Sequence, residues 1–330
     1  MSAFVIFCTI VAVILVRMVK SGIKAKPDDV WTPAKEVDAE TAAPAVGTDT
    51  PAAEARPTVE VRPTVGKDTP AAEVKPYQPV RKNAEKIFGL AGKPLAHSTS
   101  MLYFKKKFRT EGISADYCNF ELDSAGEILN LVENDTRIAG LNVTIPYKTD
   151  VIPYLDNLDD TAKEIGAVNV IKVERNGGKP VLTGYNTDYI GFGTSLKPML
   201  PEHPVKALIL GTGGAAKAVR YALEKMGIES RFVSRTSTFD ILGYYELSPS
   251  IMEEHKLIVN CTPLGMSPDK ESCPDIPYAY LTPEHILFDL IYNPETTMFL
   301  QKGIEHNTTV KNGAEMLRIQ AEEAWRIWNS

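Results

Sequence analysis

Strands and helices alternate along the chain from Lys86 onward, and this alternation restricts the fold more than any other feature of the sequence. Short apolar runs that suit buried strands, such as residues 87–91 and 138–145, are separated by longer segments that suit helices. A second series of the same kind begins with the strand predicted at 205–210. Because such alternation is typical of parallel sheets covered on both faces, the sequence predicts an α/β protein with two domains.

The predicted elements divide the chain after residue 84 into two parts. We expect one domain over 85–190, completed by the C-terminal helix at 313–330, and a second domain over 191–312. Two of the strands flank Asn176-Gly177-Gly178, which is a hairpin signal. The predicted strands are 87–91, 117–122, 138–145, 168–173, 181–185, 205–210, 231–234, 257–260 and 286–291, and the predicted helices are 99–111, 124–134, 159–165, 215–226, 297–306 and 314–328.

The first 84 residues differ from the rest in composition. Residues 1–20 hold an uncharged apolar run followed by basic residues, which predicts a single transmembrane anchor with the remaining chain on the cytoplasmic side of the inner or plasma membrane. A mis-assigned start or a buried apolar helix is the alternative. Residues 21–84 are rich in Pro, Ala and Thr and contain a duplicated segment without an apolar face, so we expect a disordered linker.

Charge and cysteine usage exclude several classes of function. A net charge of −6, with no basic patch, argues against nucleic acid as a partner. The 4 cysteines lie far apart without metal-ligand spacing, which predicts reduced thiols and no metal site. The sequence leaves the oligomeric state open, with a homodimer as one expected arrangement.

A glycine-rich turn follows the strand predicted at 205–210. Gly211, Thr212, Gly213, Gly214 and Ala215 precede Ala216 in the pattern G-x-G-x-x-A, which opens a helix. The first glycine permits a tight turn, the second lets a pyrophosphate approach the backbone, and the third small residue allows close helix packing. The helix N-terminus then faces the phosphates with free amides and partial positive charge. The turn predicts a Rossmann-type dinucleotide-binding domain, and an ordinary glycine turn is the alternative.

The end of the next strand bears on which dinucleotide is bound. An NAD site usually carries an acidic residue there, about 20 residues beyond the glycines. This chain has Ser234, Arg235 and Thr236, which suit a 2′-phosphate. We therefore expect NADP rather than NAD, and a solvated surface arginine is the alternative.

Polar residues end two strands of the first series. Asn142, Thr144 and Lys148 lie at the end of the strand at 138–145, and Asp188 closes an Asn-Thr-Asp cluster about 40 residues later. Open α/β sheets place their ligands at this edge, so we expect the ammonium and the carboxylate to meet beside the nicotinamide site. Alternatively, Lys148 is a surface lysine and Asp188 caps the helix that starts at Tyr189.

Two serines lie at the start of the helix predicted at 99–111. Ser98 and Ser100 have an ordinary interpretation as capping residues, since serine is common at helix starts. Their hydroxyls could equally bind an anion such as a carboxylate. The local sequence leaves both interpretations open.

Taken together, these motifs resemble the shikimate dehydrogenase family, NADP-dependent enzymes of aromatic biosynthesis. The resemblance covers roughly residues 86–330. It departs from the usual pattern at Tyr189, where a small residue is common, and at Ser234, where asparagine is common. The motifs lie at 92–100, 142–148, 166–169, 186–188, 211–215, 260–266 and 289–294, with Asn312-Gly313 and Gln320 near the C-terminus.

The resemblance implies hydride transfer between the nicotinamide and the C3 carbonyl of 3-dehydroshikimate. By resemblance, Lys148 transfers the proton and Asp188 is paired with it. The substrate carboxylate would bind Ser98, Ser100 and Tyr292, and the ring hydroxyls would bind Thr144, Asn169, Asp188 and Gln320. The cofactor would contact Gly211, Thr212, Gly213, Gly214, Ala215, Ser234, Arg235, Thr236, Leu290, Gly313 and Asp160.

Three rival functions remain at this stage. A quinate or quinate/shikimate dehydrogenase, using NAD or NADP, would share the fold and the lysine–aspartate pair. A membrane-tethered paralogue that binds the metabolite without catalysis is a second rival. A folate-type dehydrogenase with a similar layout is disfavoured by the two serines and the Asn-Thr-Asp cluster.

Overall fold

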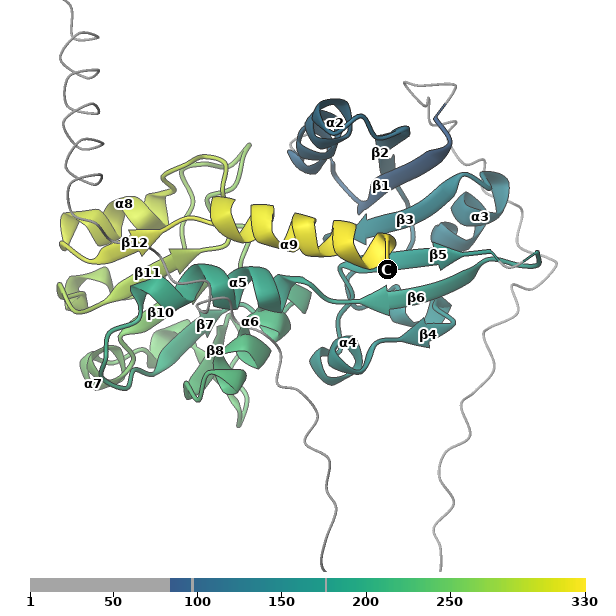
Figure 1. The fold of residues 1–330 in the computed structure, drawn as a ribbon. Helices are drawn as coiled ribbons and strands as arrows, with labels where there is room; N and C mark the ends of the chain where they lie inside the picture. The colour runs from purple at the N-terminus through teal and green to yellow at the C-terminus, as the bar shows by residue number, and fades with distance from the viewer. Residues whose placement is uncertain (1–83, 96–97, 176) are drawn as a thin grey trace, which may run out of the picture. The chain divides into compact units, whose positions relative to one another are not determined.

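Two six-stranded β-sheets with helices on their faces make up the part of the chain that the computed structural model describes, residues 84–95, 98–175 and 177–330 (Figure 1). The predicted anchor at 1–20 and nearly all of the predicted linker at 21–84 lie outside these residues. Within the described ranges, no helix has both the length and the apolar character needed to cross a bilayer.

The first sheet combines a parallel half with an antiparallel hairpin. Its strand order is β2 (Ala115–Glu121), β1 (Lys86–Gly92), β3 (Ile138–Val143), β5 (Val170–Glu174), β6 (Val181–Tyr185) and β4 (Asn157–Leu158). The first three strands are parallel and are connected through α2 (Ser100–Thr110) and α3 (Glu127–Asn134). β5 runs antiparallel to both β3 and β6. The hairpin prediction is confirmed. The first sheet is therefore mixed, because the short turn between β5 and β6 returns the chain antiparallel.

Both faces of this sheet are buried. One face packs with α3 and with α4 (Asp160–Ile165) in a cluster that includes Ile128 and Ala162. The other face lies under α2 and α9 (Ala314–Trp328), where Phe88, Phe104 and Trp328 pack together. Burial on both faces explains why the strands read as nearly continuous apolar runs in the sequence.

The second sheet is wholly parallel. Its order is β12 (Thr309–Lys311), β11 (Ile286–Asp289), β10 (Leu257–Asn260), β7 (Ala207–Leu210), β8 (Ser230–Ser234) and β9 (Ile241–Gly243). This is the strand order of the Rossmann fold, with the reversal between β7 and β10. Its helices are α6 (Gly214–Lys225), α7 (Pro249–Glu254) and α8 (Met298–Glu305). The sequence does not predict β9, β12 or α7, because they are too short to show a clear period.

Helices α5 (Asp188–Leu196) and α9 lie side by side and connect the two sheets (Figure 1). On α9, Met316 belongs to the core of the second sheet, whereas Ala324 and Trp328 belong to the core of the first. The Trp328 Nε1–H donates to the Ile171 carbonyl on β5 at 3.0 Å. The C-terminal helix therefore contributes to both cores. Short 3₁₀ turns lie at Ile152–Tyr154, Lys197–Met199, Tyr244–Glu246 and Tyr278–Tyr280.

Candidate active site

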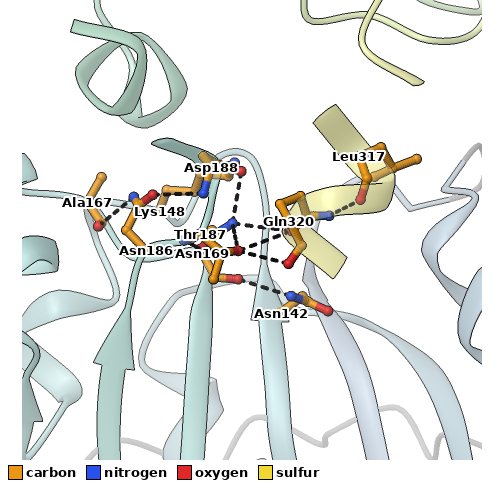
Figure 2. A network of polar contacts seen from close by, with 9 residues as sticks. All are labelled: Asn142, Lys148, Ala167, Asn169, Asn186, Thr187, Asp188, Leu317 and Gln320. Carbon is orange, nitrogen blue, oxygen red and sulfur yellow. Dashed lines mark hydrogen bonds and ion pairs between the residues drawn. The ribbon is translucent and has the colours of Figure 1, made fainter. Parts of the chain in front are cut away.

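An ion pair between Lys148 and Asp188 lies at the centre of the site (Figure 2). Lys148 follows the carboxyl end of β3, and Asp188 is the first residue of α5. The Lys148 Nζ lies 2.6 Å from the Asp188 Oδ2, and the two side chains are only 15% and 6% exposed. The structure brings together the two groups that the sequence singles out, and the Asp188 carboxylate binds lysine instead of capping α5.

Asn169 holds the other oxygen of the same carboxylate. Its Nδ2 donates to the Asp188 Oδ1 at 2.8 Å, and its Oδ1 accepts the Thr187 backbone N–H at 2.7 Å. Gln320 reaches this group from α9, with its Oε1 3.4 Å from the Asn169 Nδ2 (Figure 2). With both carboxylate oxygens bound by donors, Asp188 is held in one orientation against Lys148.

A buried tyrosine is connected to this network through Asn142. The Tyr117 hydroxyl donates to the Asn142 Oδ1 at 2.7 Å, and the Asn142 Nδ2 lies 3.4 Å from the Asn169 carbonyl. Tyr117 is fully buried and stacks on Phe104 of α2, with ring centroids 4.6 Å apart. Sequence reasoning misses Tyr117, because a tyrosine in an apolar strand reads as an ordinary core residue.

The four remaining substrate candidates lie at three places in the fold: the start of α2, the segment after β3 and the segment after β11. The Ser98 Oγ accepts the Ser100 backbone N–H at 3.3 Å, whereas the N-cap position of α2 is Thr99, which makes no side-chain capping hydrogen bond. Ser100 is buried, and Thr144 follows β3. Tyr292 follows β11 and is half-buried, and within the described ranges no hydrogen bond joins it to the two serines.

The glycine-rich turn connects β7 to α6 and lies directly beside Lys148. Gly211 has a φ of +107°, and a Cβ there would lie 3.3 Å from Thr262 of the loop after β10. A Cβ on Gly213 would meet nothing within 4 Å, whereas one on Gly214 would lie 2.7 Å from the Lys148 Cβ. The turn thus has open space at its second glycine and lies against the aliphatic part of the Lys148 side chain at its third.

The other cofactor candidates fall into three groups. Ser234 ends β8, and Arg235 and Thr236 are exposed just beyond it. Leu290 and Gly313 touch each other, since a Cβ on the glycine would collide with the leucine carbonyl oxygen.

The third group of cofactor candidates consists of Asp160 alone, which is exposed at the start of α4. Its neighbour Asp159 caps that helix, with its Oδ2 accepting the Thr161 and Ala162 N–H groups. The structure does not bring Asp160 into a hydrogen bond with any other predicted cofactor residue among those it describes.

A thiol lies near the ion pair but is poorly suited to attack. Burial, together with the nearby carboxylates of Asp289 and Asp188, raises the pKa of the Cys261 thiol well above its usual range. A thiol with a raised pKa is a poor nucleophile at neutral pH. Residues 84–95, 98–175 and 177–330 also contain no group of three or more His, Cys, Asp or Glu side chains placed to hold a metal ion.

Comparisons with known proteins agree on one family. Residues 90–171 match the model of the shikimate dehydrogenase substrate binding domain. The shikimate dehydrogenase (NADP(+)) of Aquifex aeolicus is 37% identical over 255 residues, which cover 74% of this chain and 91% of the relative.

Solved structures give the same result. A crystal structure of the Aquifex aeolicus shikimate dehydrogenase matches with a TM-score of 0.65 at 37% identity, covering 74% of this chain and 92% of that one. The Thermus thermophilus enzyme, solved with NADP(H) and shikimate, matches with a TM-score of 0.63 at 30% identity, covering 74% and 93%. This chain belongs to the shikimate dehydrogenase family.

Proposed function

We propose that this protein is a shikimate dehydrogenase that reversibly reduces 3-dehydroshikimate to shikimate with NADPH. The observation that carries the proposal is the buried Lys148–Asp188 pair, 2.6 Å from Nζ to Oδ2, directly beside the glycine-rich turn. The named relatives are NADP(+) shikimate dehydrogenases, and a structural relative was solved with NADP(H) and shikimate.

The residues of the second sheet fit a dinucleotide. A Cβ added to Gly213 would have no atom within 4 Å, so a pyrophosphate could approach the backbone at this glycine. The turn leads into α6, whose N-terminus is capped by no side chain of the described residues, so its first amides could bind phosphate. No ion pair to Arg235 occurs in the described ranges, so its guanidinium is available for a 2′-phosphate. When bound, NADPH supplies the hydride.

Lys148 and Asp188 would handle the proton. The carbonyl oxygen of the substrate gains negative charge during reduction, and the Lys148 ammonium would stabilise that charge and donate a proton from Nζ. Asp188 accepts from Lys148 through Oδ2 and from Asn169 through Oδ1, so the ammonium is aimed in one direction. In the oxidation direction the neutral amine of Lys148 would take the proton back.

The remaining substrate contacts follow the family pattern. We assign the ring hydroxyls to Thr144, Asn169, Asp188 and Gln320, of which the last three already form one network. We assign the substrate carboxylate to Ser98, Ser100 and Tyr292. The cofactor contacts are assigned to the turn at 211–215, to residues 234–236, and to Asp160, Leu290 and Gly313. The first domain, 85–190 with 313–330, would hold the substrate, and residues 191–312 would hold the cofactor.

Turnover of shikimate with NADP, followed by nicotinamide absorbance, tests the proposal. We expect activity in the wild type, and in Lys148→Ala a loss of most of kcat with little change in the KM for shikimate. Lys206→Ala is the matched control, because Lys206 pairs with Glu229 and Glu254 on the surface. A large rise in KM at normal kcat would show that Lys148 only binds substrate.

The same assay separates the rivals. Faster turnover of quinate than of shikimate, or of NAD than of NADP, would favour the quinate or quinate/shikimate dehydrogenase. Binding of nicotinamide without turnover of either substrate would favour a non-catalytic paralogue.

The apolar run at 1–20 supports a further proposal, a membrane anchor followed by a flexible linker over 21–84. Full-length protein should then sediment with membranes and be released by detergent, but not by alkaline carbonate. Protein lacking residues 1–20 is the control. Analytical ultracentrifugation of the detergent-solubilised protein tests the expected homodimer.

A further inference from the structure

The third glycine of the cofactor turn is in contact with the lysine of the ion pair. A Cβ on Gly214 would lie 2.7 Å from the Lys148 Cβ, 3.3 Å from the Ala167 Cβ and 3.5 Å from the Lys148 Cδ. Carbon atoms of packed side chains normally approach to about 3.5–4.0 Å. The Lys148 Cβ is attached directly to the backbone, so it cannot swing away as the tip of a long side chain can.

The three glycines of the turn lack side chains for different reasons. Gly211 has a φ of +107°, a conformation that favours glycine. Gly213 has an ordinary φ of −75° and open space before it, which is where a pyrophosphate would approach. Neither reason accounts for a glycine at position 214. Gly214 starts α6 in an ordinary conformation and occupies a variable position of the G-x-G-x-x-A pattern.

Lys148 has little freedom to move away from Gly214. Its carbonyl accepts the Val168 backbone N–H at 2.7 Å, which fixes its backbone. Its Nζ is held at 2.6 Å by the Asp188 carboxylate. A displacement of the Lys148 Cβ would therefore strain one of these two contacts.

We propose that Gly214 is a positioning residue for Lys148: its missing side chain lets the start of α6 lie against the lysine and sets where the ammonium is held. The proposal rests on the proposed function, in which Lys148 transfers the proton. The cofactor turn would then set the position of the Lys148 ammonium as well as bind the phosphates.

Gly214→Ala and Gly213→Ala form a matched pair, since each adds one methyl group to the same turn. In Gly214→Ala we expect kcat to fall by about 10- to 100-fold, because a displacement of about 1 Å can cost that much. The Kd for NADP, measured by fluorescence titration, should rise less in Gly214→Ala than in Gly213→Ala, because the methyl group on residue 214 would face Lys148. In Gly213→Ala the Kd for NADP should rise by roughly tenfold or more, because the methyl group fills the pyrophosphate space.

A readout independent of activity comes from the melting temperature. Gly214→Ala should lower it by roughly 5 °C, from overpacking against Lys148. Lys148→Gly removes the colliding Cβ, so the Gly214→Ala/Lys148→Gly protein should recover most of the loss that Gly214→Ala causes. The Gly213→Ala and Lys148→Gly changes should instead add independently.

Two outcomes would overturn the proposal. One is that Gly214→Ala keeps the wild-type kcat, whether or not its Kd for NADP rises as in Gly213→Ala. The other is additivity of Gly214→Ala with Lys148→Gly in the melting experiment. If wild-type protein does not turn over shikimate with NADP, the proposed function fails, and the melting cycle still decides the contact.

Discussion

Replacing Asp289 by asparagine should remove a pH dependence from the stability of the protein. Asp289 ends β11 and is fully buried. Its carboxylate accepts hydrogen bonds from the Asn260 Nδ2 at 3.0 Å, the Ile291 N–H at 3.0 Å and the Thr297 Oγ1 at 2.5 Å. Burial nevertheless raises the pKa of Asp289 from 3.8 to about 6, and the three donors offset only part of that rise.

The sign of the effect follows from where the proton is held. Between pH 3.8, the ordinary pKa of the group, and pH about 6, its pKa in the folded protein, the folded protein keeps a proton on Asp289 that the unfolded chain has lost. The free energy of unfolding must therefore fall as pH rises from about 4 to about 6 and level off above that range. A shift of about 2 pKa units corresponds to roughly 3 kcal/mol, of which about 2 kcal/mol should develop between about pH 4.5 and 7.5.

Urea unfolding of the wild type and of Asp289→Asn at those two pH values measures the effect. The difference in unfolding free energy between the two proteins should change by about 2 kcal/mol in favour of the variant as pH rises. A constant offset between the proteins does not matter, because only its change with pH is compared. A difference that stays the same at both pH values would refute the assignment of a raised pKa to Asp289.

Three further predictions follow from single contacts. Arg235→Ala should raise the KM for NADP by roughly 10- to 100-fold and leave the KM for NAD unchanged, since only NADP carries the 2′-phosphate; equal effects on both would contradict this. Tyr117→Phe leaves the buried Asn142 Oδ1 without its donor and should cost about 1–3 kcal/mol in urea unfolding, with a lower kcat. Tyr278→Phe, which removes a hydroxyl paired with the Pro274 carbonyl and with Cys273, should keep kcat. Gly140→Ala would drive a Cβ into the Trp328 Nε1, so it should cost about 1–3 kcal/mol or more; an unchanged melting temperature would show that α9 can shift.

Local sequence patterns are sufficient to predict most of the fold. The apolar runs at β1, β7 and β10 identify buried strands, and the glycine turn between β7 and α6 identifies the Rossmann half. These signals are local, because an apolar run and a glycine-rich turn are each contained in a few consecutive residues. The elements that the sequence does not reveal, such as β9 and β12, are 3 residues long and gain their structure from pairing with neighbouring strands.

The sequence also identifies the groups at the site. Lys148 and Asp188 stand out because each follows a strand, where open α/β sheets gather their ligands. By itself, however, the sequence allows a surface lysine and a helix-capping aspartate. The 2.6 Å pair excludes both alternatives, and it depends on β3 and α5 being placed together by the cores of both sheets.

The contacts that only the tertiary structure decides are those between residues far apart in the chain. Gln320 reaches Asn169 across 151 positions, because α9 packs against α5. The contact of Gly214 with Lys148, and the support of Asn142 by Tyr117, likewise join separate elements. Periodicity and turn chemistry determine which segments form strands and helices, whereas the packing of those segments determines which side chains meet.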